Sequence, residues 1–282
     1  MRKLTEGRDT PDIYGDARFT FPTKQSWGNS LFLGGTMTEI RICHLYPKEM
    51  NIYGDRGNIA VLQKRLERRG YSSSVTPIGA GEDFNPSIFD LCYLGGGQDR
   101  DQIIVAHDLQ KKSAALRSGA EDGMVFLWVC GGIQLAGEGY TDSDGRRIPG
   151  VGILDLDTSA GNRRLIGDLV LNAELDGETS TLVGYENHAG RTFLGPDATP
   201  LGSVLKGYGN NGADQTEGAV QERVIGTYMH GPILPKNPWL ADKLLTWAIE
   251  HNTGGIPTLS PLDDSLENLA QQVAISRAGV KR

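Results

Sequence analysis

The sequence lacks three things: a long apolar run, an excess of basic residues, and cysteines at paired spacing. No apolar run approaches the roughly 18 residues that a membrane-spanning helix requires. The 35 acidic residues outnumber the 28 basic ones and give a net charge of −7, which argues against a nucleic-acid-binding surface. The three cysteines form no CxxC motif and no Cys/His cluster. We therefore expect neither a disulfide framework nor a zinc site, and we predict a reducing, cytoplasmic location.

Phosphate-binding signatures are missing as well. No GxxxxGK(S/T) loop occurs, so the sequence shows no means of its own for binding ATP. The segment GYGNNG at 207–212 fits the GxGxxG pattern of dinucleotide sites, but it follows no parallel-strand pattern and opens no helix. We predict a glycine-rich loop or hairpin at that place.

The first 36 residues are mixed in composition and aperiodic, and their one apolar patch, Leu31 to Leu33, is too short for a signal peptide. Met37 opens a clean strand pattern. We expect residues 1–36 to be a disordered leader or an added extension and residues 37–255 to form the domain. Residues 256–282 are expected to be a proline-marked linker and a helix that packs on the domain or on a partner.

Strand-like and helix-like segments alternate up to about residue 130. Strands are expected at 40–46, 73–78, 89–94 and 125–129, with helices at 58–69 and 101–117. In the second helix, Ile104, Leu109 and Leu116 are the expected inward residues. The alternation predicts a parallel sheet covered on both faces, with ligands at the carboxyl ends of its strands.

After residue 150 the strand-like runs are shorter, and turns rich in Gly, Asn and Asp separate them. The expected strands are 151–156, 168–175, 182–186, 201–205, 219–221 and 224–229. This texture is typical of hairpins and of mixed or antiparallel strands. A helix is expected to begin at Asn237 and Pro238, and a last helix is expected near 264–277.

Cys130 lies at the most informative turn of the chain, FLWVCGGIQL at 126–135. A buried strand ends there, two glycines follow, and an apolar pattern resumes as a helix. Peptide N–H groups at such a turn favour a thiolate and a developing oxyanion, so the place suits a nucleophile. The alternative is a small buried hydrophobic residue, which fits Cys43 and Cys92 because both lie within apolar strands.

A thiol nucleophile needs a base, and two of the five histidines are candidates. His188 lies in GYENHAGRT, and His230 ends an apolar run and is followed by Gly-Pro. His230 is therefore expected at a sheet edge, where it could equally be a partly exposed histidine without a catalytic role. The other three histidines are most simply structural or solvated.

Three short motifs occur in order: LGGG at 94–97, VCGGIQ at 129–134 and YMHGP at 228–232. The set resembles class I glutamine amidotransferase domains, in particular the cobyric acid synthase branch. Further stretches, including NIYGDRGN at 51–58 and GYENHAGRT at 184–192, resemble the glutaminase subunits of lipid II isoglutaminyl synthases. The resemblance implies an α/β, flavodoxin-like three-layer sandwich with a central, mostly parallel sheet and added antiparallel strands in the second half.

The resemblance also implies roles for single residues. Cys130 would attack the side-chain amide of glutamine, and His230 would transfer the protons. The N–H groups of Gly96 and Gly131 would form the oxyanion hole.

Gln134 and Arg164 match the positions that hold the substrate glutamine in the wider family. The register of the following LIGD favours Arg164 over Arg163, and a guanidinium is suited to gripping a carboxylate. On the residues alone, Arg164 reads as a surface loop residue. Pro232 stands where class I enzymes usually have the third catalytic residue, a glutamate, so either a dyad suffices or a partner subunit supplies the carboxylate. Trp128 replaces a frequent glycine, which leaves the exact geometry of the turn open.

The resemblance further implies a heterodimer with a Mur-ligase-like synthetase subunit. This chain would use L-glutamine and hold no cofactor or metal, whereas the partner would bind ATP and Mg. The partner would amidate the α-carboxyl of D-glutamate in lipid II to D-isoglutamine, a step of peptidoglycan biosynthesis. The expected location is the cytoplasm, at the inner face of the membrane through lipid II.

Three alternatives stay open at this point. The chain could be a glutaminase subunit for another acceptor, such as a cobalamin precursor. It could be a stand-alone cysteine hydrolase on a related fold, or a regulatory subunit that keeps the fold without the activity.

Overall fold

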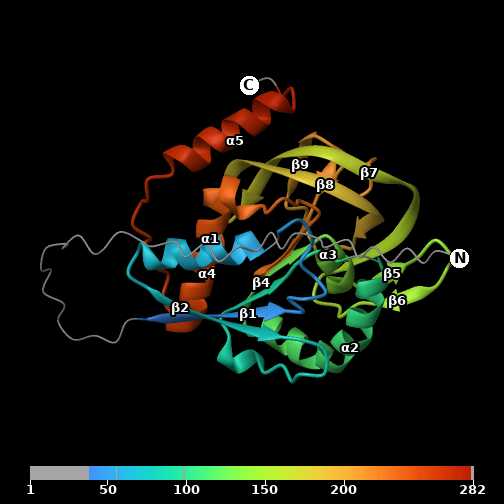
Figure 1. Cartoon of the computed structure of the whole chain (residues 1–282), viewed down its shortest axis with the longest axis horizontal. Helices are drawn as coiled ribbons and strands as arrows, with labels where there is room; N and C mark the ends of the chain where they lie inside the picture. Colours follow the sequence, from blue (N-terminus) through green and yellow to red (C-terminus); the bar gives the residue numbers. More distant parts are fainter. Residues whose placement is uncertain (1–37, 55, 98, 281–282) are drawn as a thin grey trace, which may run out of the picture. The chain divides into compact units, whose positions relative to one another are not determined.

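The computed structural model describes residues 38–54, 56–97 and 99–280 (Figure 1). The predicted leader, residues 1–36, lies outside these ranges. Within them, no helix is both long enough and apolar enough to cross a membrane.

The first half of the chain alternates strands and helices as predicted. Its elements are β1 (Glu39–Leu45), η1 (Ile52–Gly54), α1 (Arg56–Glu67), β2 (Ser72–Ile78), η2 (Pro86–Ile88), β3 (Leu91–Leu94), α2 (Asp99–Glu121), β4 (Val125–Val129) and α3 (Gly131–Ala136). The four strands pair in parallel in the order β4-β3-β1-β2. Their carboxyl ends therefore share one edge of the sheet.

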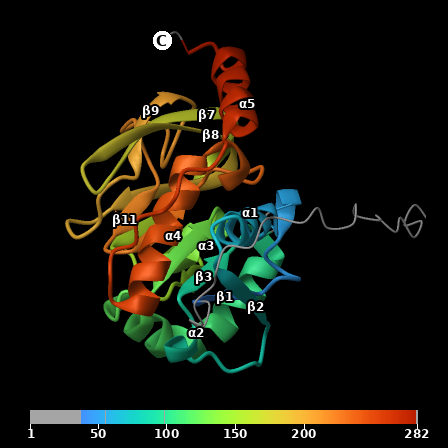
Figure 2. The ribbon, with the colours of Figure 1, turned by 90° about the vertical axis from the view of Figure 1, so that its left-hand side faces the viewer.

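The second half extends this sheet and adds another. Its elements are β5 (Gly139–Thr141), β6 (Arg147–Pro149), β7 (Leu156–Leu175), β8 (Glu178–Leu194), β9 (Gly202–Lys206), β10 (Thr216–Glu217), β11 (Ala219–Gln221), β12 (Val224–Thr227), η3 (Leu234–Lys236), α4 (Pro238–Thr253) and α5 (Ser265–Arg277). Strand β12 joins β4 in parallel, and β11 closes the edge antiparallel. Helices α1 and α4 lie on one side of the first sheet and α2 on the other (Figures 1 and 2). The predicted three-layer α/β architecture is confirmed.

Two predictions for the second half are wrong. The separate strands expected at 168–175 and 182–186 are parts of two long antiparallel strands, β7 and β8, which pair over nearly their whole lengths. Their register shifts between Ala160 and Leu165, where Gly161 and Asn162 read as a turn but form an irregularity within the ladder. The expected strand at 151–156 is also wrong, since only Leu156 is extended into a ladder. The segment 207–212 forms turns between β9 and β10, as predicted.

Helices α1 and α2 bury the faces that their apolar spacing indicates, with one exception. Ile59, Leu62 and Leu66 of α1 are buried, and so are Leu109 and Leu116 of α2. Ile104 is not an inward residue, because 52% of it is exposed. The buried side of α2 passes through the next residue, Val105, and adjacent helical residues point about 100° apart.

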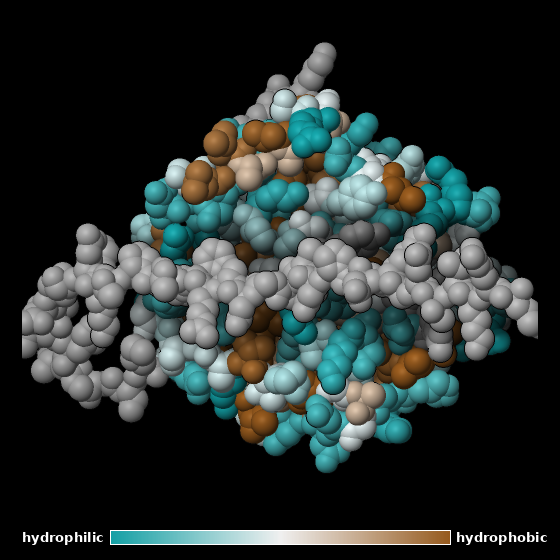
Figure 3. Space-filling view, in the orientation of Figure 1, coloured by the Kyte–Doolittle hydropathy of each residue, from teal (hydrophilic) through white to brown (hydrophobic). Residues whose placement is uncertain are grey.

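Helix α5 rests on the domain through a small contact. Ile275 and Ala278 pack on Val170 of β7 and Val183 of β8, and the Gln271 side chain donates a 2.9 Å hydrogen bond to a carbonyl of β8. Leu266, Leu269 and Val273 follow one another along the helix and are 76%, 56% and 49% exposed. The space-filling view shows hydrophobic colour over this helix (Figure 3). The helix thus leaves an apolar row uncovered in this chain.

A buried arginine ties the linker before α5 to the helices below it. Arg65 of α1 donates two hydrogen bonds to Asp242 of α4, at 2.6 and 2.8 Å, and two to Asp264, at 2.6 and 2.9 Å. Arg69 binds the same Asp242 carboxylate and the Ser260 carbonyl. Because paired bonds between a guanidinium and a carboxylate fix orientation as well as distance, the network sets the path of the chain into α5.

Removal of this arginine should be costly. We expect Arg65→Ala to lower the free energy of unfolding by about 3 kcal/mol, because it leaves the partly buried Asp264 carboxylate without its arginine and leaves Asp242 with Arg69 alone. Lys64→Ala removes the neighbouring exposed pair with Glu67 and should cost less than about 1 kcal/mol. Urea unfolding of both variants measures the difference, and equal losses would contradict the role given to Arg65.

Candidate active site

Cys130 connects β4 to α3, as its sequence context predicts. Its backbone lies at φ 54° and ψ −105°, a region that non-glycine residues rarely occupy. The Cys130 N–H donates a 2.8 Å hydrogen bond to the Thr227 carbonyl at the end of β12, which helps to hold the turn. Such backbone strain persists only where the surroundings impose it, and it is concentrated at functional sites. The thiol is thereby fixed at the carboxyl edge of the parallel sheet.

The absence of a side chain at Gly96 allows the other predicted groups to lie close to Cys130. A Cβ placed on Gly96 would lie 2.8 Å from His230 Cε1 and 3.3 Å from Cys130 Cβ. A Cβ on Gly132 would lie 3.0 Å from the Leu94 carbonyl oxygen. The shortest of these distances is one that real Cβ atoms essentially never show, and the others are unusually tight, so glycines at these positions allow the loop after β3 to approach the cysteine turn closely. Cys130, His230, Gly96 and Gly131 therefore form one cluster.

His230 is held by its backbone against β8. Its N–H donates to the Tyr185 carbonyl at 2.7 Å, and the Tyr185 N–H donates back at 3.3 Å. The residue is fully buried. Gly231 follows with φ 91°, and the ring of Pro232 then packs on Gly57 of α1. The position that carries a glutamate in many class I enzymes is thus turned toward α1.

His188, the second candidate base, has a different setting. Its ring stacks on Tyr228 with 3.6 Å between centroids, its Nδ1 lies 3.0 Å from the Gly190 carbonyl, and its Nε2 lies 3.4 Å from Glu186. Burial lowers the pKa of this histidine. Both ring nitrogens are engaged by these neighbours, which favours a structural role for His188 and leaves His230 as the better base.

The two predicted substrate-binding residues, Gln134 and Arg164, differ from each other in burial and in surroundings. Gln134 lies on α3 directly behind Cys130; its Oε1 accepts from Gln102 at 2.7 Å and its Nε2 donates to the Tyr228 hydroxyl at 3.2 Å. Arg164 is exposed, and it lies within β7 rather than in a loop. Its guanidinium donates to the side-chain and main-chain oxygens of Asn187 at 2.8 and 2.9 Å.

Pattern reading missed a buried acid beside the site. Glu217 accepts a 2.6 Å hydrogen bond from the Tyr228 N–H and further bonds from the Thr227 hydroxyl. Burial raises the pKa of Glu217 to about 8, although these hydrogen bonds act in the opposite direction. Its strand is only two residues long, too short to give a recognisable pattern. Gln102 and Tyr228 were also missed, although both lie within or next to the motifs quoted above.

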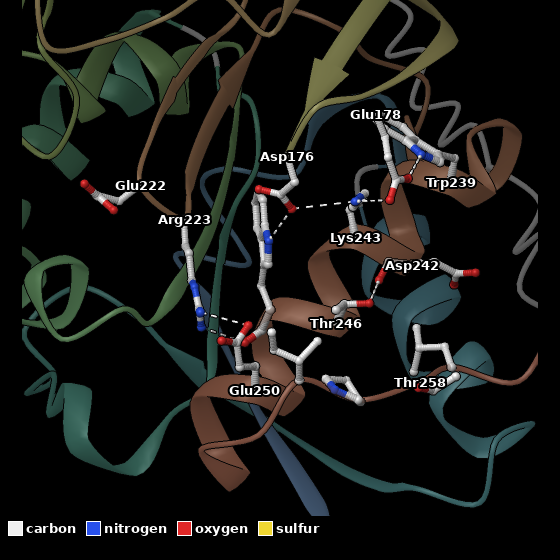
Figure 4. A pocket seen from close by; sticks show the side chains of 14 residues that line it. Asp176, Glu178, Glu222, Arg223, Trp239, Asp242, Lys243, Thr246, Glu250 and Thr258 are labelled. Atoms are coloured by element: carbon white, nitrogen blue, oxygen red, sulfur yellow. Dashed lines mark hydrogen bonds and ion pairs between the residues drawn. The ribbon is translucent and has the colours of Figure 1, made fainter.

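A large groove on the described surface lies apart from this cluster. It encloses about 820 Å³ along α4, between the β7–β8 turn and residues 256–259 (Figure 4). Its walls are held by interactions such as Lys243 with Glu178 at 3.0 Å and the Trp247 indole with Asp176 at 3.0 Å. None of the Cys130 cluster lines it. The cysteine cluster is therefore not part of this groove.

Metal-binding chemistry finds no support in the described ranges. In residues 38–54, 56–97 and 99–280, no group of three or more His, Cys, Asp and Glu side chains could hold a metal ion.

Comparison with known proteins places the chain in a family. Residues 41–238 match the CobB/CobQ-like glutamine amidotransferase domain, and the chain belongs to this family. The lipid II isoglutaminyl synthase (glutamine-hydrolyzing) subunit GatD of Staphylococcus aureus is 41% identical over 243 residues, which cover 86% of this chain and 97% of that protein. The subunit of the same name from Streptococcus pneumoniae is 39% identical, over 86% of this chain and 92% of that one.

A more distant relative is the cobyric acid synthase of Pelotomaculum thermopropionicum. It is 28% identical over 82% of this chain but only 46% of its own length. The resemblance to glutamine amidotransferases seen in the motifs is thus confirmed.

The titration of Glu217 should appear in the pH dependence of stability. A carboxyl group whose pKa rises from 4.5 to about 8 on folding is protonated in the native chain when the unfolded chain has released its proton. The contribution of this carboxyl group to the free energy of unfolding is fully present below about pH 4.5 and is lost as the pH rises through about 8. Glu217→Gln should therefore lose less unfolding free energy than wild type between about pH 5 and about pH 8.

Urea unfolding at the two pH values measures this difference. Glu222→Gln, at an exposed turn close by, is the matched control and should follow wild type. Equal pH dependence of wild type and Glu217→Gln would contradict the assignment.

Proposed function

We propose that this chain is the glutaminase subunit of a lipid II isoglutaminyl synthase. The observation that carries the proposal is the convergence of Cys130, His230 and Gly96 at the carboxyl edge of the parallel sheet. The comparisons support the proposal, because this chain is 41% identical to a subunit of that name and the match covers 97% of that protein's length.

In the proposed reaction, the Cys130 thiolate attacks the side-chain carbonyl carbon of L-glutamine after His230 takes the thiol proton. The N–H groups of Gly131 and Gly96 stabilise the oxyanion. His230 returns the proton to the leaving nitrogen, which departs as ammonia and leaves a glutamyl thioester on Cys130. His230 then activates a water molecule, which releases glutamate and restores the thiol.

Arg164 and Gln134 are proposed to hold the substrate. A guanidinium can bind the free α-carboxylate of glutamine through two hydrogen bonds, and Arg164 is exposed with a guanidinium that already donates to Asn187. Gln134 lies one helical turn after Cys130, with its amide group buried close to the cysteine turn.

The ammonia is proposed to pass to a Mur-ligase-like partner in a heterodimer. That partner binds ATP and Mg and amidates lipid II, so this chain needs no cofactor and acts in the cytoplasm, at the inner membrane face through lipid II. We assign residues 37–255 to the amidotransferase domain. The linker and helix of 256–282, with the exposed row of Leu266, Leu269 and Val273, are proposed to face the partner.

The nearest competing function is a glutaminase for another acceptor. The cobyric acid synthase relative favours it, because that relative shares most of this domain. A stand-alone cysteine hydrolase has less support, since the similarity to the lipid II enzyme subunits extends over 86% of this chain.

Amidation of lipid II by the complex tests the function. We expect Cys130→Ala to reduce glutamine-dependent amidation by at least about a thousandfold, because the nucleophile is lost, and to leave ammonium-dependent amidation unchanged. Cys92→Ala removes a buried thiol outside the cluster and should retain both reactions. Release of glutamate by wild type without amidation of lipid II would support the glutaminase chemistry and overturn the acceptor.

The third catalytic group is proposed to come from the partner, because Pro232 cannot supply a carboxylate from the usual position. The isolated chain should then hydrolyse glutamine at least about tenfold more slowly than the complex, since the partner's carboxylate would complete the catalytic site. Glutamate release by the chain alone and by the complex gives the comparison. Equal rates would show that Cys130 and His230 suffice without the partner.

A further inference from the structure

A buried chain of hydrogen bonds runs behind the catalytic cluster. The Gln102 side chain donates to Gln134, Gln134 donates to the Tyr228 hydroxyl, and that hydroxyl lies 2.7 Å from Thr192, which lies 2.8 Å from Thr158. The five residues are at most 6% exposed. They come from α2, α3, the end of β12, β8 and β7. We call this chain the polar bridge.

The polarity of the bridge is set at one end by a carbonyl group. Gln102 Nε2 lies 3.4 Å from the Gly131 carbonyl oxygen, which can only accept, and 2.7 Å from Gln134 Oε1. The Gln134 amide must then turn its Nε2 toward Tyr228. The Tyr228 hydroxyl accepts that bond and shares a second hydrogen bond with Thr192, in which either hydroxyl can donate. The Gln102 amide thus orients the Gln134 amide, which in turn donates to Tyr228.

Packing leaves the bridge little freedom to move. The Tyr228 ring is covered by the parallel ring of His188 at 3.6 Å. A Cβ on Gly190 would lie 2.4 Å from Gln134 Nε2 and 2.7 Å from the Tyr228 hydroxyl oxygen, so only glycine leaves the space that the two groups occupy.

The bridge also connects the segments that bear the catalytic groups. Gln102 lies six residues after Gly96, Gln134 four residues after Cys130, and Tyr228 two residues before His230. We propose that Gln102 and Tyr228 are positioning residues of the glutaminase reaction. They act through Gln134, whose amide they hold in one orientation, and they fix the three segments relative to one another. This inference rests on the proposed function.

The first test reverses the polarity of the bridge. Gln102→Glu keeps the shape of the side chain but places an acceptor against Gln134 Oε1 and the Gly131 carbonyl. In the complex, kcat for glutamine-dependent amidation should fall by at least about tenfold, while ammonium-dependent amidation stays at the wild-type rate. Gln110→Glu is the matched control on the same helix, because its amide donates to the carbonyls of 149 and 150 outside the bridge.

The second test removes one hydroxyl. Tyr228→Phe keeps the ring that stacks on His188 and should also lower kcat by about tenfold. Tyr46→Phe removes a comparable buried bond, to Asp108 at 2.9 Å, outside the bridge and should leave kcat unchanged. Gln102 and Tyr228 are joined through Gln134 alone in the bridge. The double variant should therefore lose much less than the product of the single losses.

The outcomes separate this inference from the function on which it rests. If the wild-type complex shows no Cys130-dependent reaction with glutamine, the proposed function fails. If it does, but both single variants keep wild-type kcat, the positioning role is overturned and the function stands. The inference is equally overturned if the losses multiply in the double variant, or if they are accompanied by a fall in Tm larger than that of Tyr46→Phe.

Discussion

The close approach of two backbone turns is the constraint on which the rest of the site depends. The loop after β3 and the turn after β4 meet at distances that leave little or no room for a Cβ at Gly96 or Gly132. The parallel register of β3 and β4 delivers both turns to the same edge, and β12 adds the segment that carries His230. The strained backbone of Cys130 is held because its neighbours on three strands leave it no alternative.

Much of the first half of the fold could be predicted from the sequence, because its signals are local. Apolar strands and helices alternate there, and most of them are followed by a glycine where the chain must turn. Cys130 was found for the same reason, since strand, thiol and glycines are adjacent in the chain. The second half was predicted less well, because Gly161 and Asn162 interrupt the pattern of β7 without ending the strand.

The parts of the site that escaped prediction are held by contacts between distant residues. Gln102 and Gln134 are 32 positions apart, and Gln134 and Tyr228 are 94 apart. No periodicity marks such pairs, since a buried glutamine or tyrosine has the same local pattern whether it is bonded or not. Ile104 shows the same limit at a smaller scale, because an apolar residue in a helix can face solvent when its neighbour Val105 lies on the packed side.

The glycine at position 190 makes the substitutions that two distant parts of the chain can accept depend on each other. Its missing side chain is the space that the Gln134 amide and the Tyr228 hydroxyl fill. If position 190 acquires a larger residue, position 134 must take a shorter or differently oriented side chain. If the side chain at 134 shortens first, an empty space remains beside Gly190. These positions are 56 apart in the sequence, yet they should change as a pair among descendants of this chain or remain fixed together.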